Sequence, residues 1–301
     1  QVLLPLGKGA LGMRVVFVSP PTNDVDKIVG GWDCWNEEPA IRIPYQQHGI
    51  QDDANILMQV KAIMPDVIFY VGAVAGKGLP SVRTLCMLRL IAPLIHLCCD
   101  GGDHPWWPVL DNYAASKCFD RQVSIDGAGK DHVDLITLTP IDLRPYETRI
   151  QPDGRTIKCG FAGNIGSGHR RNLIKPLENA GWVVPRLRDG SSYADYVGFL
   201  FKCHMIINSA VTGSTKHMHV KGRVLESAFA GCALMEMAGA PTKEWFPEQL
   251  FYLHDGDAAE RIQELTIEKI INQATVFSEY ALSRYHPKII YRQILGGIVS
   301  I

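Results

Sequence analysis

The chain alternates short β-branched runs with longer helical segments, and it does so twice. The first series of runs lies at 14–19, 67–71, 94–98, 121–125 and 135–138. The second lies at 157–162, 182–185, 205–208, 232–237 and 250–253. A polar stretch with two prolines, residues 141–154, separates the series as a linker does. Because strands that alternate with helices form parallel sheets covered on both faces, the sequence predicts an α/β protein with two Rossmann-like, doubly wound domains facing a cleft.

These patterns also predict the domain boundaries. The first domain is expected at residues 13–145 and the second at 156–275. Residues 276–301 read as C-terminal helices, broken near a proline, that pack back on the first domain. Met13 directly precedes the first strand, so residues 1–12 are expected to be an artificial extension or an upstream remnant.

Composition excludes several classes of protein. The 301 residues are 47% hydrophobic and 20% charged, with a net charge of −1, which gives no electrostatic reason to expect nucleic acid as a partner. The longest apolar run, 85–99, contains Arg89 and Pro93 and is too short for a transmembrane segment. Eight cysteines form no CxxC pair and lie scattered in apolar runs, so we expect reduced thiols in a cytoplasmic protein.

The segment 219–231, HVKGRVLESAFAG, predicts a ligand site. Its apolar side chains recur at helical spacing, at Val224, Leu225, Ala228 and Phe229. Glu226 stands off that face, next to three cations, Lys216, Lys221 and Arg223. A carboxylate in the first helical turn can accept hydrogen bonds from a diol, while N–H groups and cations there suit phosphates. The alternative is an amphipathic surface helix whose charged side chains are solvated.

A second candidate lies where the strand at 157–162 runs into a glycine-rich loop and a helix. Gly163, Asn164 and Gly166 belong to the loop, and Arg170 or Arg171 follows in the helix. Glycines at this position let the backbone approach a pyrophosphate, whose charge the helix N–H groups and an arginine can meet. The spacing GxxGxG is not the dinucleotide fingerprint GxGxxG, so a simple strand-to-helix loop is the alternative.

The loop after the buried strand 94–98 offers acid or base groups. Asp100, Asp103 and His104 follow the strand's carboxyl end, where open α/β sheets bind ligands. Trp106 and Trp107 could stack on a sugar there, or simply pack between the lobes. Two DxD triplets, at 24–26 and 255–257, are explained by turns and helix capping, so no metal site is predicted. The GxSxG and GxxxxGK[ST] motifs are absent, which excludes serine hydrolases and P-loop NTPases.

The second series resembles the nucleotide-sugar-binding lobe of GT-B-fold glycosyltransferases of the group 1 type. Three segments carry the resemblance: GFAGNIGSGHRRN, RVLESAFAGCALM and EWFPEQLFYLHDGDAAERIQEL. The tail ALSRYHPKIIYRQIL resembles the closing helix of the spore-maturation (CgeB-like) branch. The match covers roughly residues 156–295, while the first half matches only in its strand–helix rhythm.

The resemblance implies a metal-independent, hexosyltransferase-like enzyme. It would move a sugar from a UDP- or GDP-type nucleotide-sugar to a carbohydrate or other hydroxyl acceptor, with no tightly bound cofactor. The first domain would bind the acceptor and the second the donor. Glu226 would hold the ribose, and the diphosphate would face the glycine loop and the cations: Gly163, Asn164, Gly166, Arg170 or Arg171, Lys216, Lys221 and Arg223. His104, Asp103 or Asp100 would deprotonate or position the acceptor hydroxyl.

Two features leave alternatives open. Many relatives carry a second Glu shortly before the ribose-binding one, but this chain has Met218 and His219 there, so the sugar and the stereochemical outcome are not predicted. The same fold also serves nucleotide-sugar epimerases and hydrolases, and a non-catalytic, two-lobed protein could close on a small ligand.

Overall fold

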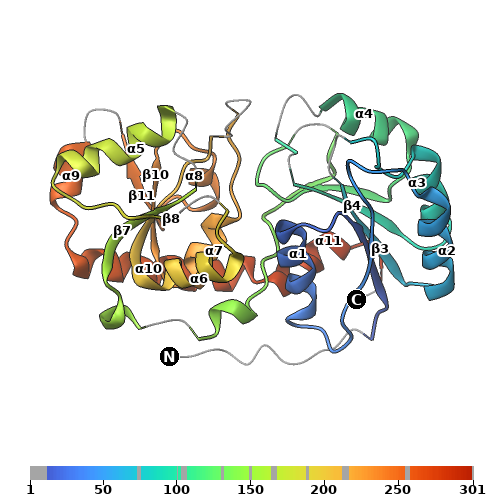
Figure 1. The fold of residues 1–301 in the computed structure, drawn as a ribbon, viewed down its shortest axis with the longest axis horizontal. Coiled ribbons are helices and arrows are strands. Elements are labelled where there is room, and N and C mark those ends of the chain that lie inside the picture. Colours follow the sequence, from blue (N-terminus) through green and yellow to red (C-terminus); the bar gives the residue numbers. More distant parts are fainter. Residues whose placement is uncertain are drawn as a thin grey trace.

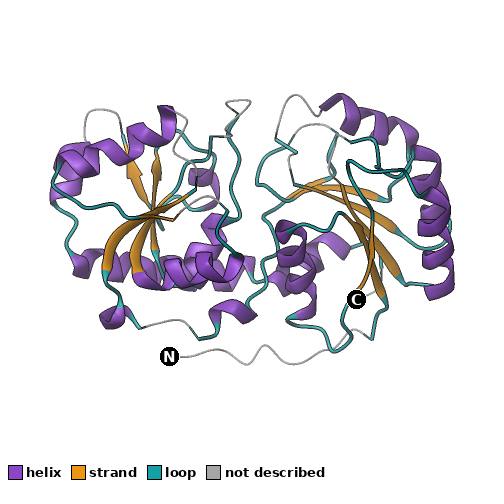
Figure 2. Ribbon diagram, in the orientation of Figure 1, coloured by secondary structure: helices purple, strands orange, loops and turns teal. Residues whose placement is uncertain are grey.

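Two lobes, each built on a parallel sheet, lie side by side (Figure 1). The structure is a computed structural model that describes residues 12–72, 76–99, 101–102, 107–129, 132–148, 151–163, 168–187, 190–211, 217–254 and 258–299. Helices cover both faces of each sheet, as Figure 2 shows by colour. The α/β, two-domain prediction is therefore confirmed.

The N-terminal lobe contains a six-stranded sheet. Its strands lie in the order β2 (Ile41–Pro44), β1 (Val15–Ser19), β3 (Val67–Gly72), β4 (Leu94–Cys98), β5 (Arg121–Ser124) and β6 (Leu135–Ile136). All five neighbouring pairs are parallel. The chain first moves outward to β2 and then crosses back past β1 to β3, so the strand order reverses at β1. Such a reversal leaves a crevice at the carboxyl ends of the strands.

Alternation of side chains along β1 explains how both faces of this sheet are covered. Val16 and Val18 point into a core shared with α2 (Asp53–Ile63), α3 (Val82–Arg89) and α4 (Trp107–Ser116). Val15 and Phe17 point into the core on the opposite face, which α1 (Asn23–Asp33) and α11 (Pro287–Leu295) cover.

The C-terminal lobe repeats this plan with five strands. Their order is β11 (Phe251–Leu253), β10 (Ala233–Met237), β9 (Cys203–Ile207), β7 (Ile157–Ala162) and β8 (Arg186–Leu187), again all parallel. One face packs on α5 (Gly168–Asn179) and α9 (Ala258–Gln263). The other packs on α6 (Tyr193–Lys202) and α7 (Arg223–Phe229), while α8 (Thr242–Trp245) follows β10. The long helix α10 (Ile267–Tyr285) contacts α7, β9 and β10.

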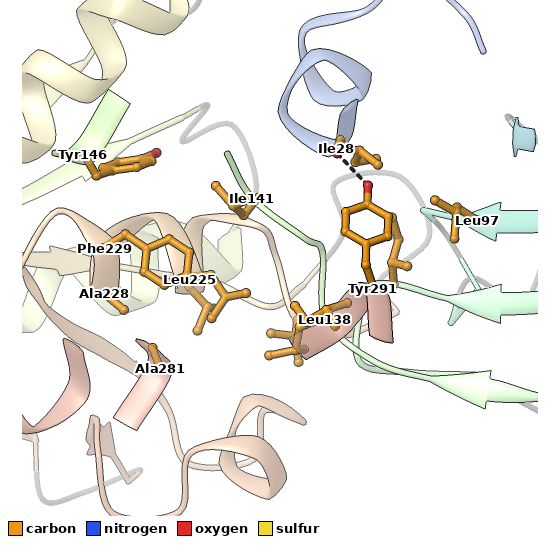
Figure 3. Close-up of a cluster of buried hydrophobic side chains, with 14 of the residues drawn as sticks. Ile28, Leu97, Leu138, Ile141, Tyr146, Leu225, Ala228, Phe229, Ala281 and Tyr291 are labelled. Carbon is orange, nitrogen blue, oxygen red and sulfur yellow. Dashed lines mark hydrogen bonds between the residues drawn. The ribbon is translucent and has the colours of Figure 1, made fainter. Parts of the chain in front are cut away.

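One hydrophobic core runs through both lobes (Figure 3). Leu138, Ile141 and Tyr146 of the connecting chain pack in the same cluster as Leu225 and Phe229 of α7. Two 3-10 turns, η2 (Arg144–Tyr146) and η3 (Pro152–Gly154), occupy the predicted linker.

The end of the chain returns to the N-terminal lobe. After α10, helix α11 contacts α1, and the hydroxyl of Tyr291 donates to the carbonyl oxygen of Ile28 at 2.6 Å (Figure 3). Arg121 of β5 donates to the carbonyl oxygen of Ile294 in the last turn of this helix at 2.7 Å and to that of Gly296 just past it at 2.8 Å. The last helix therefore belongs physically to the core of the first lobe.

The sequence-based prediction of secondary structure failed for three elements. The strand predicted at 182–185 is wrong, because the N–H of Phe161 bonds to Pro185 and strand β8 starts only at Arg186. Proline has no N–H for the ladder. Helix α1 and strand β2 were not predicted at all. Two adjacent glycines, Gly30 and Gly31, lower the helix propensity of α1.

Two further observations concern the cysteines and the described helices. All eight cysteines are free thiols. Among the described helices, none is both long and apolar enough to cross a membrane.

Candidate functional site

A cavity of about 610 Å³ lies between the two lobes. The N-terminal lobe contributes the start of α1, through Asn23, Asp24 and Lys27, and the chain beyond β5. The C-terminal lobe contributes the carboxyl ends of β7 and β9, at Gly163 and Ser209, with the segment that enters α7. Strands β7 and β9 flank the point where the strand order of this lobe reverses, so the cavity lies where a doubly wound sheet binds ligands.

Glu226 lines this cavity and is only 3% exposed. The hydroxyl of Tyr196 on α6 donates to its Oε2 at 3.0 Å. The ammonium group of Lys27 on α1 lies 3.0 Å from Oε1 as an ion pair, although Oε1 accepts no aligned hydrogen bond. Residues 224–229 are all buried, so the alternative of a solvated surface helix is wrong.

Lys27 is the N-terminal lobe's main contact with this carboxylate. Burial by itself lowers the pKa of Lys27, but the charges of Glu226 and Asp24 outweigh it and raise the pKa above its usual value. Its ammonium group also lies 4.8 Å from the ring centroid of Tyr193, whose hydroxyl pairs with that of Tyr146 at 2.8 Å. Two tyrosines of α6 and a lysine of the opposite lobe therefore surround the buried carboxylate.

Cations line the C-terminal side of the cavity. Arg170, Lys221 and Arg223 all contribute to the wall. Among the described residues, Arg223 forms no ion pair, and its buried Nε has no hydrogen-bond partner. Gly163 has a φ of +130°, and a Cβ there would lie 3.1 Å from Nη2 of Arg223. The glycine thus lets the guanidinium lie against the end of β7. Arg171 is exposed and does not line the cavity, so Arg170 is the arginine of the pair that reaches it.

An aspartate and a histidine from different lobes meet at the same cavity. Asp126 follows β5, and its Oδ2 lies 2.8 Å from Nδ1 of His219. The carboxylate also accepts from the hydroxyl of Ser124 at 2.5 Å and from the N–H groups of Gly102 and Ala128, each at 3.3 Å. Burial raises the pKa of Asp126 to about 6, against the opposing effect of these hydrogen bonds.

Several predicted residues lie outside the described residues: Asp100, Asp103, His104, Asn164, Gly166 and Lys216. Trp107 opens α4 and donates from Nε1 to the carbonyl oxygen of Gly101 at 3.2 Å. In the first DxD triplet, Asp24 pairs with Lys27 and Asp26 with Arg42. The described part of the chain holds no cluster of three or more His, Cys, Asp or Glu that could bind a metal, and the triplet at 255–257 lies outside it.

Sequence reasoning missed the residues that the site takes from unpredicted or distant segments. These are Lys27, Asp126, Tyr193 and Tyr196. The two tyrosines stand three apart on a correctly predicted helix, so their common face could have been noticed. Lys27 lies on the missed helix α1, and nothing local links Asp126 to a histidine 93 residues further on.

Comparison with known proteins supports the fold. No protein-family profile and no curated protein sequence matches the chain. Among solved structures, Anabaena HepE with UDP-glucose has a TM-score of 0.59 at 11% identity, over 94% of this chain and 98% of that one. An α-glucosyltransferase with UDP and DNA gives 0.62 at 10% identity, over 94% and 99%. A glycosyltransferase from Rickettsia africae gives 0.60 at 8%, over 95% and 100%. The chain therefore has the GT-B fold, as predicted.

Proposed function

We propose that this protein is a hexosyltransferase-like enzyme that moves a sugar from a nucleoside-diphosphate sugar to an acceptor hydroxyl. The observation that carries the proposal is the buried carboxylate of Glu226 beside Arg170, Lys221 and Arg223 in one inter-lobe cavity. A carboxylate can accept both hydroxyls of a ribose, and a cationic wall with a glycine turn suits a diphosphate. Three structures with this fold are described as a UDP-glucose complex, a UDP complex of a glucosyltransferase and a glycosyltransferase.

The positive charge supplied by the side chains supports transfer without a bound metal. The leaving diphosphate gains negative charge as the glycosidic bond breaks, and fixed cations stabilise it there. Activity should therefore persist in excess chelator. For the acceptor side, we propose that His104, Asp103 or Asp100 deprotonates or positions the hydroxyl, since in the sequence they follow the strand at 94–98, and open α/β sheets bind ligands at the carboxyl ends of their strands.

The remaining details of the proposal follow the sequence resemblance. The tail favours the spore-maturation (CgeB-like) branch, and the ligands in similar structures favour a UDP-type donor over a GDP-type donor. The net charge of −1 supports a carbohydrate or other small hydroxyl acceptor rather than nucleic acid. Free thiols support a reducing, cytoplasmic setting.

Nucleotide binding by the Glu226→Gln variant tests the proposal. Titration calorimetry with UDP and GDP should show that the variant binds the preferred nucleotide about tenfold to a hundredfold more weakly, because hydrogen bonds to a charged group are lost. Glu279→Ala, which removes an exposed carboxylate on α10, is the matched control and should bind like the native protein. Equal affinity in the native protein and Glu226→Gln would exclude the ribose assignment.

Product analysis then separates transfer from the alternatives. The native protein is incubated with UDP-glucose, with and without a panel of sugar acceptors, and products are followed by mass spectrometry. A glycosyltransferase releases UDP and forms a glycoside only when its acceptor is present. An epimerase or hydrolase changes the donor without any acceptor, and a binding protein leaves it intact.

A further inference from the structure

The protonation pattern of His219 follows from its two neighbours. The ammonium group of Lys221 contacts Nε2, and an ammonium group can only donate hydrogen bonds. The lone pair of the imidazole therefore lies at Nε2, and the hydrogen lies at Nδ1, which donates to Asp126 at 2.8 Å. The ring is neutral in this state, and both His219 and Lys221 line the cavity.

The pair depends on contact between the lobes. The N–H of Val220 donates to the carbonyl oxygen of Asp126 at 2.7 Å. The next residue, Gly127, has a φ of +70°, and a Cβ there would overlap the side chain of Val220. Trp245 of the C-terminal lobe donates to the carbonyl oxygen of Gly127 at 3.0 Å. Backbone contacts thus hold the carboxylate and the imidazole together only when the lobes meet.

His219 shares the cavity with charged groups from three helices of the two lobes. Besides its two direct neighbours, they are Asp24 and Lys27 on α1, Arg170 on α5, and Arg223 and Glu226 on α7. Lys27 and Glu226 pair with each other. His219 therefore lines the same cavity as Arg170, Lys221 and Arg223, to which the proposed function assigns the diphosphate.

We propose that His219 binds a proton when the diphosphate enters and, as an imidazolium, stabilises the leaving group. The inference rests on the proposed function. A phosphate oxygen draws the ammonium group of Lys221 away from Nε2, and Nε2 then takes a proton from solvent and donates it in a hydrogen bond to the diphosphate. Asp126 is the positioning residue, because its carboxylate fixes the ring and balances the imidazolium charge.

The chemical step then balances as follows. The bond between the anomeric carbon and the β-phosphate oxygen breaks, and its electron pair stays on that oxygen. The imidazolium of His219 and the ammonium group of Lys221 stabilise the new charge. The acceptor oxygen bonds to the anomeric carbon, and its proton passes to a base of the N-terminal lobe.

The burial of Asp126 favours an imidazolium beside it. Its carboxylate is 4% exposed, and burial raises its pKa to about 6. An imidazolium beside it supplies the counter-charge that the neutral ring lacks, so binding a diphosphate and ionising the pair favour each other.

Proton uptake on nucleotide binding tests the inference without knowledge of the acceptor. UDP is titrated into the native protein and His219→Gln at about pH 7.5, in HEPES and in Tris, whose different ionisation enthalpies report the protons exchanged. The native protein should take up about half a proton to one proton more than the variant. The variant should bind UDP about tenfold to a hundredfold more weakly, because glutamine offers a neutral donor.

Matched variants make each result decisive. His48→Gln changes an exposed histidine far along the chain from the site and should behave like the native protein. Asp126→Asn should still bind UDP but lose at least half of the proton uptake, and it tests the pair independently if His219→Gln does not fold. Equal proton uptake in the native protein and either variant overturns the inference, whereas failure of the native protein to bind UDP or GDP overturns the proposed function itself.

Discussion

Removing one partner of the ion pair between Lys27 and Glu226 should cost several kcal/mol, because both charges are buried where the lobes meet. The side chains are 16% and 4% exposed, so water replaces neither partner well. Lys27→Met removes the counter-charge of the carboxylate, although the hydroxyl of Tyr196 still donates to it. Removing one partner of a buried pair costs about 3–5 kcal/mol, because the other charge stays buried and unpaired.

The second single variant should be milder. In Glu226→Gln, Lys27 keeps Asp24 as a partner at 3.1 Å and retains some contact with water, so we expect a loss of about 1–2 kcal/mol. The double variant should fall within about 1 kcal/mol of the native protein, because methionine can pack on the ring of Tyr193 and the glutamine still accepts from Tyr196. The coupling energy, which is the sum of the two single losses minus the loss of the double variant, is then about 3–8 kcal/mol.

Urea unfolding of the four proteins measures this coupling. Lys61→Met, an exposed lysine on α2, is the control and should change stability by less than about 0.5 kcal/mol. If the losses of the two single variants simply add in the double variant to within about 0.5 kcal/mol, the pair is not coupled and the reasoning is refuted. Nucleotide affinity gives a second test. Lys27→Met should bind UDP more tightly than the native protein, because under the proposed function the ribose would no longer compete with the lysine for Oε1 of Glu226.

Two further predictions concern the framework of the site. Burial raises the pKa of Glu236 to about 6, so the folded state binds its proton more tightly than the unfolded state. Stability should therefore fall by roughly 2 kcal/mol as the pH rises from about 4.5 through 6, and Glu236→Gln should lack this fall in urea titrations at about pH 5 and 7.5. The same slope in both proteins would contradict the assignment. Gly31→Ala places a Cβ against the carbonyl oxygen of Pro140 and should cost more than about 2 kcal/mol. Gly198→Ala, with open space around it in α6, should instead gain about 0.5–1 kcal/mol in the same thermal melts.

Local pattern was sufficient for much of the fold. The strand at 94–98, the strand at 157–162 and the helix at 193–202 match β4, β7 and α6 residue for residue. Each is a continuous or periodic apolar segment bounded by turn residues, so the information lies within a few neighbours along the chain. The break near Pro287 between α10 and α11 is of the same kind.

Helix α1 shows where local pattern fails. Its glycines lower the helix propensity, but they are required because a Cβ on Gly30 would overlap Asp142 and one on Gly31 would overlap Pro140. The chain leaving the first lobe crosses α1 at this point. Only tertiary structure reveals that reason, and missing the helix also meant missing Lys27.

Two pairs of side chains join the lobes, Lys27 with Glu226 and Asp126 with His219, and in each pair the two lobes contribute opposite kinds of group. Neither lobe therefore carries both partners of a pair. The first lobe supplies a cation to the acid Glu226 and an acid to the base His219. Opening the cleft would therefore separate Glu226 from Lys27 and His219 from Asp126, while each keeps a partner in its own lobe, Tyr196 or Lys221. Under the proposed function, a nucleotide in the cavity would offer hydroxyls to Glu226 and a diphosphate to His219, so it would replace the contacts that join the lobes. A variant that removes one of the two pairs should then alter nucleotide affinity and unfolding stability together.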